Sequence, residues 1–137
     1  MTLRVGNAPC SWGSLEFEAL HEEINYVQML DEMVATGYVG TELGSLGVLP
    51  TTPAELGKTL SAHQLSLMGG FVPVALADPA SHAAGVELAL KTAELMASVS
   101  SDAYVVLADD NGTRPSRTQN AGRVASEHGL SPEQWKH

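Results

Sequence analysis

The side chains best able to do chemistry follow short apolar segments of the sequence. Trp12 lies in the loop 10–13 after residues 3–8, and Glu42 lies between glycines near the end of residues 38–43. A carboxylate in such a turn could bind a hydroxyl or act as a general acid or base, but a solvated or capping carboxylate is the ordinary alternative. The indole of Trp12 could form one wall of a site or simply plug the space beneath its loop.

Other candidate groups favour structural interpretations. Asp109-Asp110-Asn111-Gly112 suggests a cation loop but lacks the spacing and the distal glutamate of an EF-hand, so a turn is favoured. Cys10 lies in a loop that could hold a nucleophile, yet no basic residue is adjacent, which favours a buried or half-buried thiol. Gly69-Gly70 lacks the motifs of a phosphate loop and predicts a kink in a strand.

The histidines give no metal signature. No two of them have the i,i+4 or short-loop spacing that places ligands around one ion. We therefore interpret all five as surface residues: His21, His63, His82, His128 and His137.

Composition excludes several classes of partner. Among 137 residues, 7 Lys and Arg stand against 16 Asp and Glu, and the resulting net charge of −9 disfavours nucleic acid and anionic membranes. No run of eighteen apolar residues is present, so no membrane-spanning helix is predicted. A single cysteine and an N-terminus without a signal-peptide pattern predict the cytoplasm.

Apolar periodicity predicts strands that alternate with helices. One helix begins at Ile24 and ends at a C-cap at Gly37, and a second has Thr52 as N-cap, Pro53 at its first position and Glu55 as capping-box partner. A third helix covers 81–98, with Glu87 and Lys91 as an i,i+4 pair. The predicted strands cover residues 3–8, 38–43, 65–72, where Pro73 should stop pairing, and 103–108, whose apolar run suits a strand covered on both faces.

This alternation predicts an α/β fold with a parallel sheet, either open or closed into a barrel. Four units are about half of an eight-unit barrel. Ser131-Pro132-Glu133-Gln134 has the pattern of a helix start, and 109–129 is a long polar loop. We therefore expect residues 1–137 to form a partial domain whose fold continues beyond this chain.

Three motifs in order along the chain carry a family resemblance. They are Gly6-Asn7-Ala8-Pro9-Cys10-Ser11-Trp12-Gly13, Gly37-Tyr38-Val39-Gly40-Thr41-Glu42-Leu43-Gly44 and Leu107-Ala108-Asp109-Asp110. They resemble the ends of strands one, two and four in xylose-isomerase-like (β/α) barrels of the sugar phosphate isomerase and epimerase superfamily, and are most like the myo-inosose dehydratase group. The resemblance implies the N-terminal half, about four βα units, of a TIM-type barrel.

The resemblance also implies a metal ion and a set of substrate-binding residues. Such enzymes hold a divalent metal, commonly manganese, cobalt or magnesium, with Glu, Asp and His of later strands that lie beyond His137. The early strands supply the substrate-facing wall, which here implies four substrate-binding positions: Asn7, Trp12, Glu42 and Phe71. Base-excision endonucleases of this fold place zinc-binding histidines after early strands, and Phe71 and Asp109 stand nearby here, so that branch is disfavoured.

Three functional hypotheses follow. The first is the N-terminal part of a metal-dependent sugar isomerase, epimerase or inosose dehydratase that removes a proton next to a carbonyl. The second is a small open-sheet ligand-binding domain, and the third is a non-functional partial chain. The first implies a small sugar or inosose as substrate, no catalytic or metal-binding residues in this chain alone, and exposed half-barrel edges through which copies could associate. Arg114 and Arg117 are the candidates for any phosphate group.

Overall fold

The computed structural model describes residues 3–13, 25–109 and 115–136. Within these ranges one parallel sheet has four strands in chain order. The strands are β1 (Gly6–Asn7), β2 (Gly40–Ser45), β3 (Ser66–Val74) and β4 (Tyr104–Asp109). Consecutive parallel neighbours are the arrangement of one half of a (β/α) barrel, so the predicted fold class is confirmed.

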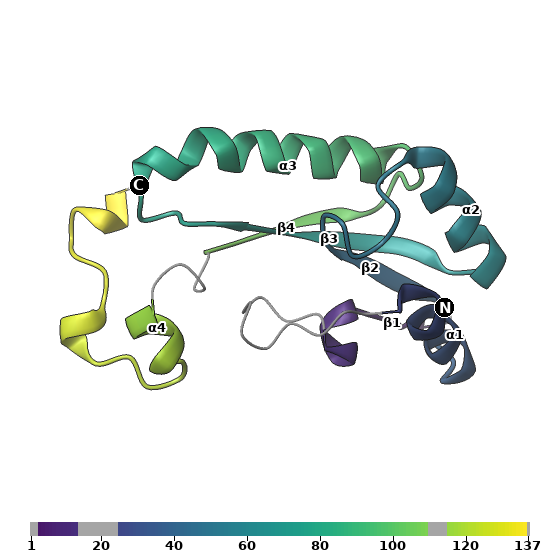
Figure 1. The fold of residues 1–137 in the computed structure, drawn as a ribbon, viewed down its shortest axis with the longest axis horizontal. Coiled ribbons are helices and arrows are strands. Elements are labelled where there is room, and N and C mark those ends of the chain that lie inside the picture. The colour runs from purple at the N-terminus through teal and green to yellow at the C-terminus, as the bar shows by residue number, and fades with distance from the viewer. Residues whose placement is uncertain (1–2, 14–24, 110–114, 137) are drawn as a thin grey trace.

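Three helices cover one face of this sheet (Figure 1). They are α1 (Tyr26–Ala35), α2 (Pro53–His63) and α3 (His82–Ala97). One apolar cluster joins them to the strands, and it includes Met29 and Met33 of α1, Leu60 of α2, Met96 of α3 and Leu43 of β2. The shorter elements are η1 (Pro9–Trp12), η3 (Pro79–Ser81), α4 (Pro115–Gln119), η4 (Ser126–His128) and η5 (Gln134–Lys136).

The helix signals in the sequence are confirmed. The hydroxyl oxygen of Thr52 accepts a hydrogen bond from the Glu55 N–H at 3.4 Å, and its own proton goes to the Glu55 carboxylate at 2.7 Å. In the capping box that the sequence predicts, the Glu55 side chain would instead accept a hydrogen bond from the backbone N–H of Thr52. Gly37 follows α1 with φ of +90°, the left-handed conformation in which glycine has no steric penalty. Ile24 lies outside the described residues.

A similar exchange of hydrogen bonds forms near the C-terminal end of the chain. The Ser131 hydroxyl accepts from the Gln134 N–H at 3.3 Å, and the Gln134 side-chain carbonyl accepts from the Ser131 N–H at 2.9 Å. The turn that follows is the 3-10 element η5 rather than an α-helix. The stretch predicted as an uninterrupted polar loop also contains two short helical elements, α4 and η4.

The strands differ from the predicted ones in three respects. Pro73 does not end β3, because it stays in register opposite Ala108 and the strand runs to Val74. β1 has only two residues, although the Val5 carbonyl still accepts from the Val39 N–H at 2.9 Å. β4 is exposed along most of its length rather than covered on both faces, because it is the edge strand of the described sheet.

A bulge in β3 sets which side chains face away from the helices. Thr41 pairs with Leu67, but Glu42 pairs with Gly69, so Met68 is an additional residue in β3. The Met68 sulfur lies over β2, where it would be 2.4 Å from any Cβ placed on Gly40. Met68 and Gly40 therefore belong to the face without helices, which we call the bare face of the sheet.

Candidate functional site

Glu42 and Phe71 lie on the bare face of neighbouring strands, where Glu42 pairs with Gly69 and Phe71 with Ser45. Leu43 is fully buried against the helices, so Glu42, which precedes it, points the other way. Val72 is likewise fully buried on the helix side, which places Phe71 on the bare face. The Glu42 Cγ lies 3.7 Å from where a Cβ on Gly69 would be, so this glycine leaves space beside the carboxylate. Both side chains are half-buried.

Glu42 and Phe71 lie near the middle of β2 and β3, each three residues before the last residue of its strand at the carboxyl edge of the sheet. Loops at this edge carry the active sites of parallel β/α folds. The edge lies toward the left of Figure 1, where α3 begins. A half-buried carboxylate beside an aromatic ring can accept hydrogen bonds from hydroxyls while the ring covers the C–H face of the same small molecule.

Asn7 and Trp12 hold the β1–α1 loop. The Asn7 side-chain oxygen accepts hydrogen bonds from the Ala8 N–H at 2.8 Å and the Ser11 hydroxyl at 3.0 Å. The Trp12 indole packs against the apolar cluster, and its N–H donates to the Glu32 carboxylate of α1 at 2.7 Å. The structure thus places Glu42 and Phe71 on the same face of the sheet, whereas Trp12 lies against α1.

The carboxylate that receives the Trp12 N–H is electrostatically perturbed. The Gln28 side chain donates a hydrogen bond to Glu32 at 2.9 Å. Together with the bond from Trp12, it lowers the pKa of Glu32 below its ordinary value of 4.5. Hydrogen bonds to the charged form are the cause, and they tie the loop after β1 to α1 most firmly when Glu32 is ionised.

Sequence reasoning missed a pair of side chains at the same edge of the sheet. The Leu76 N–H, in the β3–α3 loop, donates to the Asp109 carboxylate at 3.0 Å, and the Leu76 carbonyl lies 2.9 Å from Nε2 of His82. A carbonyl only accepts, so Nε2 carries a proton. Asp109 at the end of β4 and His82 at the start of α3 therefore fix the backbone of this loop. The sequence carried a signal for this pair. Asp109 and His82 follow neighbouring predicted strands, and neighbouring parallel strands end at the same edge of a sheet.

Three of the expected exposures require correction. Cys10 is exposed, not a buried or half-buried thiol, because its loop turns outward beside the buried Pro9. His82 is half-buried, and the His63 side chain is only 14% exposed, with its Nε2 3.3 Å from the Asp31 carboxylate. These two histidines bridge neighbouring elements instead of standing free on the surface.

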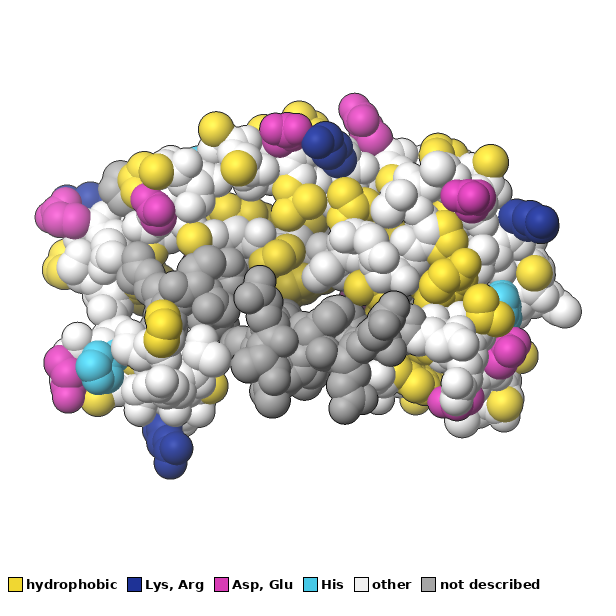
Figure 2. All heavy atoms as spheres, in the orientation of Figure 1, with side chains coloured by type: hydrophobic (Ala, Val, Ile, Leu, Met, Phe, Trp, Pro, Cys, Tyr) yellow, Lys and Arg dark blue, Asp and Glu magenta, His cyan; other side chains and the backbone are white. Residues whose placement is uncertain are grey.

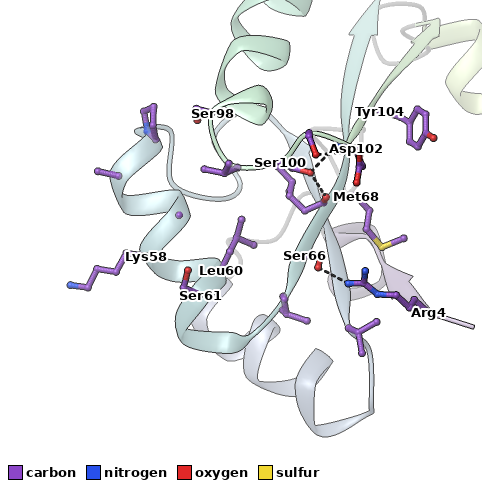
Figure 3. A pocket seen from close by; sticks show the side chains of 18 residues that line it. Arg4, Lys58, Leu60, Ser61, Ser66, Met68, Ser98, Ser100, Asp102 and Tyr104 are labelled. Carbon is purple, nitrogen blue, oxygen red and sulfur yellow. Dashed lines mark hydrogen bonds between the residues drawn. The ribbon is translucent and has the colours of Figure 1, made fainter. Parts of the chain in front are cut away.

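A cavity of about 880 Å³ lies at the opposite edge of the sheet (Figure 3). Its lining includes Ser66 and Tyr104, the first residues of β3 and β4, with Lys58 of α2 and Asp102. The Arg4 guanidinium donates to the Ser66 hydroxyl at 2.7 Å. We do not assign the candidate site to this cavity, because the amino-end face of such barrels contributes to stability, whereas the active sites lie at the carboxyl ends of the strands.

The metal implied by the resemblance does not fit the donors in the described part of the chain. No three His, Cys, Asp or Glu side chains gather into a possible metal site within 3–13, 25–109 and 115–136. Residues Asp110 to Arg114 lie outside these ranges, as does the side chain of Arg117.

The fold and its carboxyl-end site define a parallel α/β half barrel of the kind found in TIM-type enzymes. Comparison with curated proteins then shows similarity to inosose dehydratases. The chain is 35% identical over 68 residues to that of Salmonella typhimurium, 34% over 67 residues to that of Lacticaseibacillus casei, and 33% over 75 residues to that of Geobacillus kaustophilus. The resemblance inferred from the motifs is confirmed.

These matches cover part of each protein. They span 50%, 49% and 55% of this chain, but only 22%, 22% and 24% of the respective relatives. The matched segment is thus less than a quarter of each relative's length. No protein-family model matches the chain. In the described residues, no helix combines the length and apolarity needed to cross a membrane.

Proposed function

We propose that this chain supplies the first four βα units of a sugar-modifying enzyme of the inosose dehydratase kind. The observation that carries the proposal is the placement of Glu42 and Phe71 on the bare face of neighbouring strands, each three residues before the carboxyl end of its strand. The similarity to three inosose dehydratases supports an inosose or a related cyclic sugar as the ligand. Residues 1–137 then form one partial barrel domain.

The proposed reaction is loss of water from a hydroxyketone. A base removes the proton next to the carbonyl and the electron pair forms an enediolate-like intermediate. The hydroxyl on the next carbon then takes up a proton and leaves as water, so that one proton is removed and one is returned. Isomerisation and epimerisation share the first of these steps. A divalent metal that polarises the carbonyl oxygen would belong to this chemistry, but the described donors do not form its site.

The contribution of this chain is to bind and orient the ligand. Glu42 accepts hydrogen bonds from ligand hydroxyls, and Phe71 covers an apolar C–H face of the ring. Asp109 and His82 fix the loop at the mouth of the site through Leu76. We expect binding without turnover by the 137-residue chain, even with manganese present.

Calorimetry with an inosose tests the proposal. We expect the chain to bind the ligand, and Glu42→Gln to weaken binding by about 10- to 100-fold, the size of one charge-assisted hydrogen bond. Phe71→Ala should weaken it as well. Asp102→Asn is the matched control, because it makes the same chemical change in the cavity at the opposite edge. Equal losses from Glu42→Gln and Asp102→Asn, or no binding at all, would refute the site.

A second assay tests the reaction class. In heavy water, abstraction of the proton next to the carbonyl exchanges deuterium into an inosose, which mass spectrometry detects. We expect no exchange above the uncatalysed rate with the chain and manganese. Metal-dependent exchange that Glu42→Gln abolishes would show that the described residues do hold the catalytic machinery.

A further inference from the structure

Three neighbouring strands bring Glu42, Gly69 and Tyr104 into one row across the sheet. Glu42 of β2 pairs with Gly69 of β3, and Gly69 pairs with Tyr104 of β4. Tyr104 is the first residue of β4, but this register places it level with Glu42. Paired residues of a parallel sheet point to the same face, so all three positions belong to the bare face.

Two further observations place the Tyr104 side chain on the bare face. Ala103 packs against the apolar cluster on the helix side, and successive side chains along a strand point to opposite faces. Figure 3 shows the Tyr104 ring on the side of the strands opposite α2. The side chain is 76% exposed, so its phenol is accessible to a molecule on that face.

Gly69 leaves a gap between the side chains of Glu42 and Tyr104. The side-chain atoms nearest to a Cβ built on Gly69 are Cγ and Cδ of Glu42, at 3.7 Å and 3.8 Å. The Met68 side chain does not fill this gap, because its sulfur lies over Gly40 of β2. Strands lie about 4.8 Å apart, so about 9.6 Å separates the Cα atoms of Glu42 and Tyr104.

Phe71 bounds this gap on the side nearer the carboxyl ends of the strands. It follows Gly69 by two residues, so it lies on the same face about 6.6 Å further along β3. Its partner on β4 is Val106, which adds a second apolar side chain at that level. A carboxylate, a phenol and an aromatic ring therefore surround the position that lacks a side chain.

These groups favour an uncharged ring that carries hydroxyl groups on opposite edges. An ionised carboxylate such as Glu42 only accepts hydrogen bonds, whereas the phenol of Tyr104 both donates and accepts. The Lys and Arg side chains visible in Figure 2 lie at the outer margin of the molecule. An anionic substituent over Gly69 would therefore meet the like charge of Glu42, whereas a hydroxyl would meet an acceptor.

We propose that Tyr104 is a ligand-binding residue of the site that contains Glu42 and Phe71. A ring over Gly69 presents one hydroxyl to the Glu42 carboxylate and the opposite hydroxyl to the Tyr104 phenol, while Phe71 covers its C–H face. Gly69 is part of the site because any side chain there would occupy the place of the ring. This proposal rests on the proposed function, since it assigns Tyr104 to the same site.

Calorimetry with an inosose tests the role of Tyr104. Tyr104→Phe removes only the hydroxyl, and we expect it to weaken binding about 2- to 10-fold, the effect of one neutral hydrogen bond. Tyr38→Phe is the matched control, because the Tyr38 ring packs against the apolar cluster on the helix side. Gly69→Ala should weaken binding at least tenfold. Thermal melting verifies the fold of each variant, and Tyr104→Phe decides the question even if Gly69→Ala fails to fold.

Monodeoxy-inososes separate a direct contact from a structural effect. The analogue that lacks the hydroxyl held by Tyr104 should bind the unmodified chain and Tyr104→Phe equally, whereas the other analogues should still bind the variant more weakly. A loss from Tyr104→Phe that is the same for every analogue would overturn the proposal, because no single ligand hydroxyl would then meet the phenol.

The remaining outcomes distinguish this proposal from the proposed function. Binding that Glu42→Gln weakens and Tyr104→Phe leaves unchanged would overturn the role of Tyr104 alone. Tyr104 also lines the cavity at the opposite edge of the sheet, so an equal loss from Asp102→Asn would place the ligand there and overturn the proposal. No binding of an inosose to the unmodified chain would overturn both the role of Tyr104 and the proposed function.

Discussion

Gly85 controls how closely α3 approaches the carboxyl end of β3. A Cβ at this position would lie 2.6 Å and 2.8 Å from the two methyl groups of Val74, which is 7% exposed. Valine is stiff at χ1, so rotation that moves one methyl away brings the other closer. The lack of a side chain at Gly85 therefore sets the distance between α3 and the strand that carries Phe71.

The expected effect of Gly85→Ala combines two opposing terms. Alanine is about 1 kcal/mol better than glycine inside a helix, whereas overpacking a core typically costs about 1–3 kcal/mol. We expect a net destabilisation of up to about 2 kcal/mol. Gly57→Ala in α2 is the control, because the nearest atom there is a Val99 methyl at 3.6 Å, and it should stabilise by about 0.5–1 kcal/mol.

Urea unfolding at one fixed protein concentration measures both variants. A double-mutant cycle isolates the contact: with Val74→Ala in place, Gly85→Ala should stabilise by about 1 kcal/mol, giving a coupling energy of about 1–3 kcal/mol. If Gly85→Ala stabilises as much as Gly57→Ala, or if the coupling is below about 0.5 kcal/mol, the close approach of α3 to β3 is refuted.

Three further predictions concern single hydrogen bonds. Asp109→Ala should speed amide exchange at Leu76 by about fivefold, because one net hydrogen bond is worth about 1 kcal/mol; an unchanged rate would contradict the contact. Thr52→Ala should cost about 1 kcal/mol in urea unfolding through the lost N-cap of α2, and a neutral effect would contradict it. Because hydrogen bonds hold the pKa of Glu32 below 4.5, its contribution to stability is complete above that pH and is lost as the pH falls through the lowered pKa. The indole N–H resonance of Trp12 should shift over that acidic range, and Glu32→Gln should abolish the shift.

The sequence predicted the order of elements because its local signals are strong. Thr52, Pro53 and Glu55 fixed the start of α2, and Gly37 fixed the end of α1. Strand ends were less predictable. Pro73 lacks a backbone donor but keeps its carbonyl and its place in the ladder, so it did not end β3.

The candidate site could be predicted only in part. The position of Glu42 follows from its strand, but the placement of Phe71 on the same face depends on a bulge at Met68 that shifts every later residue of β3 to the other face. The same limit applies to Trp12, since its contact with Glu32 joins residues that are distant in sequence. The sequence could indicate that Asp109 and His82 lie at one edge of the sheet, but not that the backbone N–H and carbonyl of Leu76 join them, because backbone groups carry no sequence signal.

The most direct test of the account is to map where an inosose binds on the ¹⁵N-labelled chain by NMR. The account predicts that the amide signals of Glu42, Gly44 and Phe71 shift together on titration. Shifts confined to the cavity that contains Ser66 and Asp102 would place binding at the wrong edge of the sheet. Those shifts, or a spectrum unchanged by saturating inosose, would contradict the assignment of the carboxyl ends of these strands as a sugar-binding site.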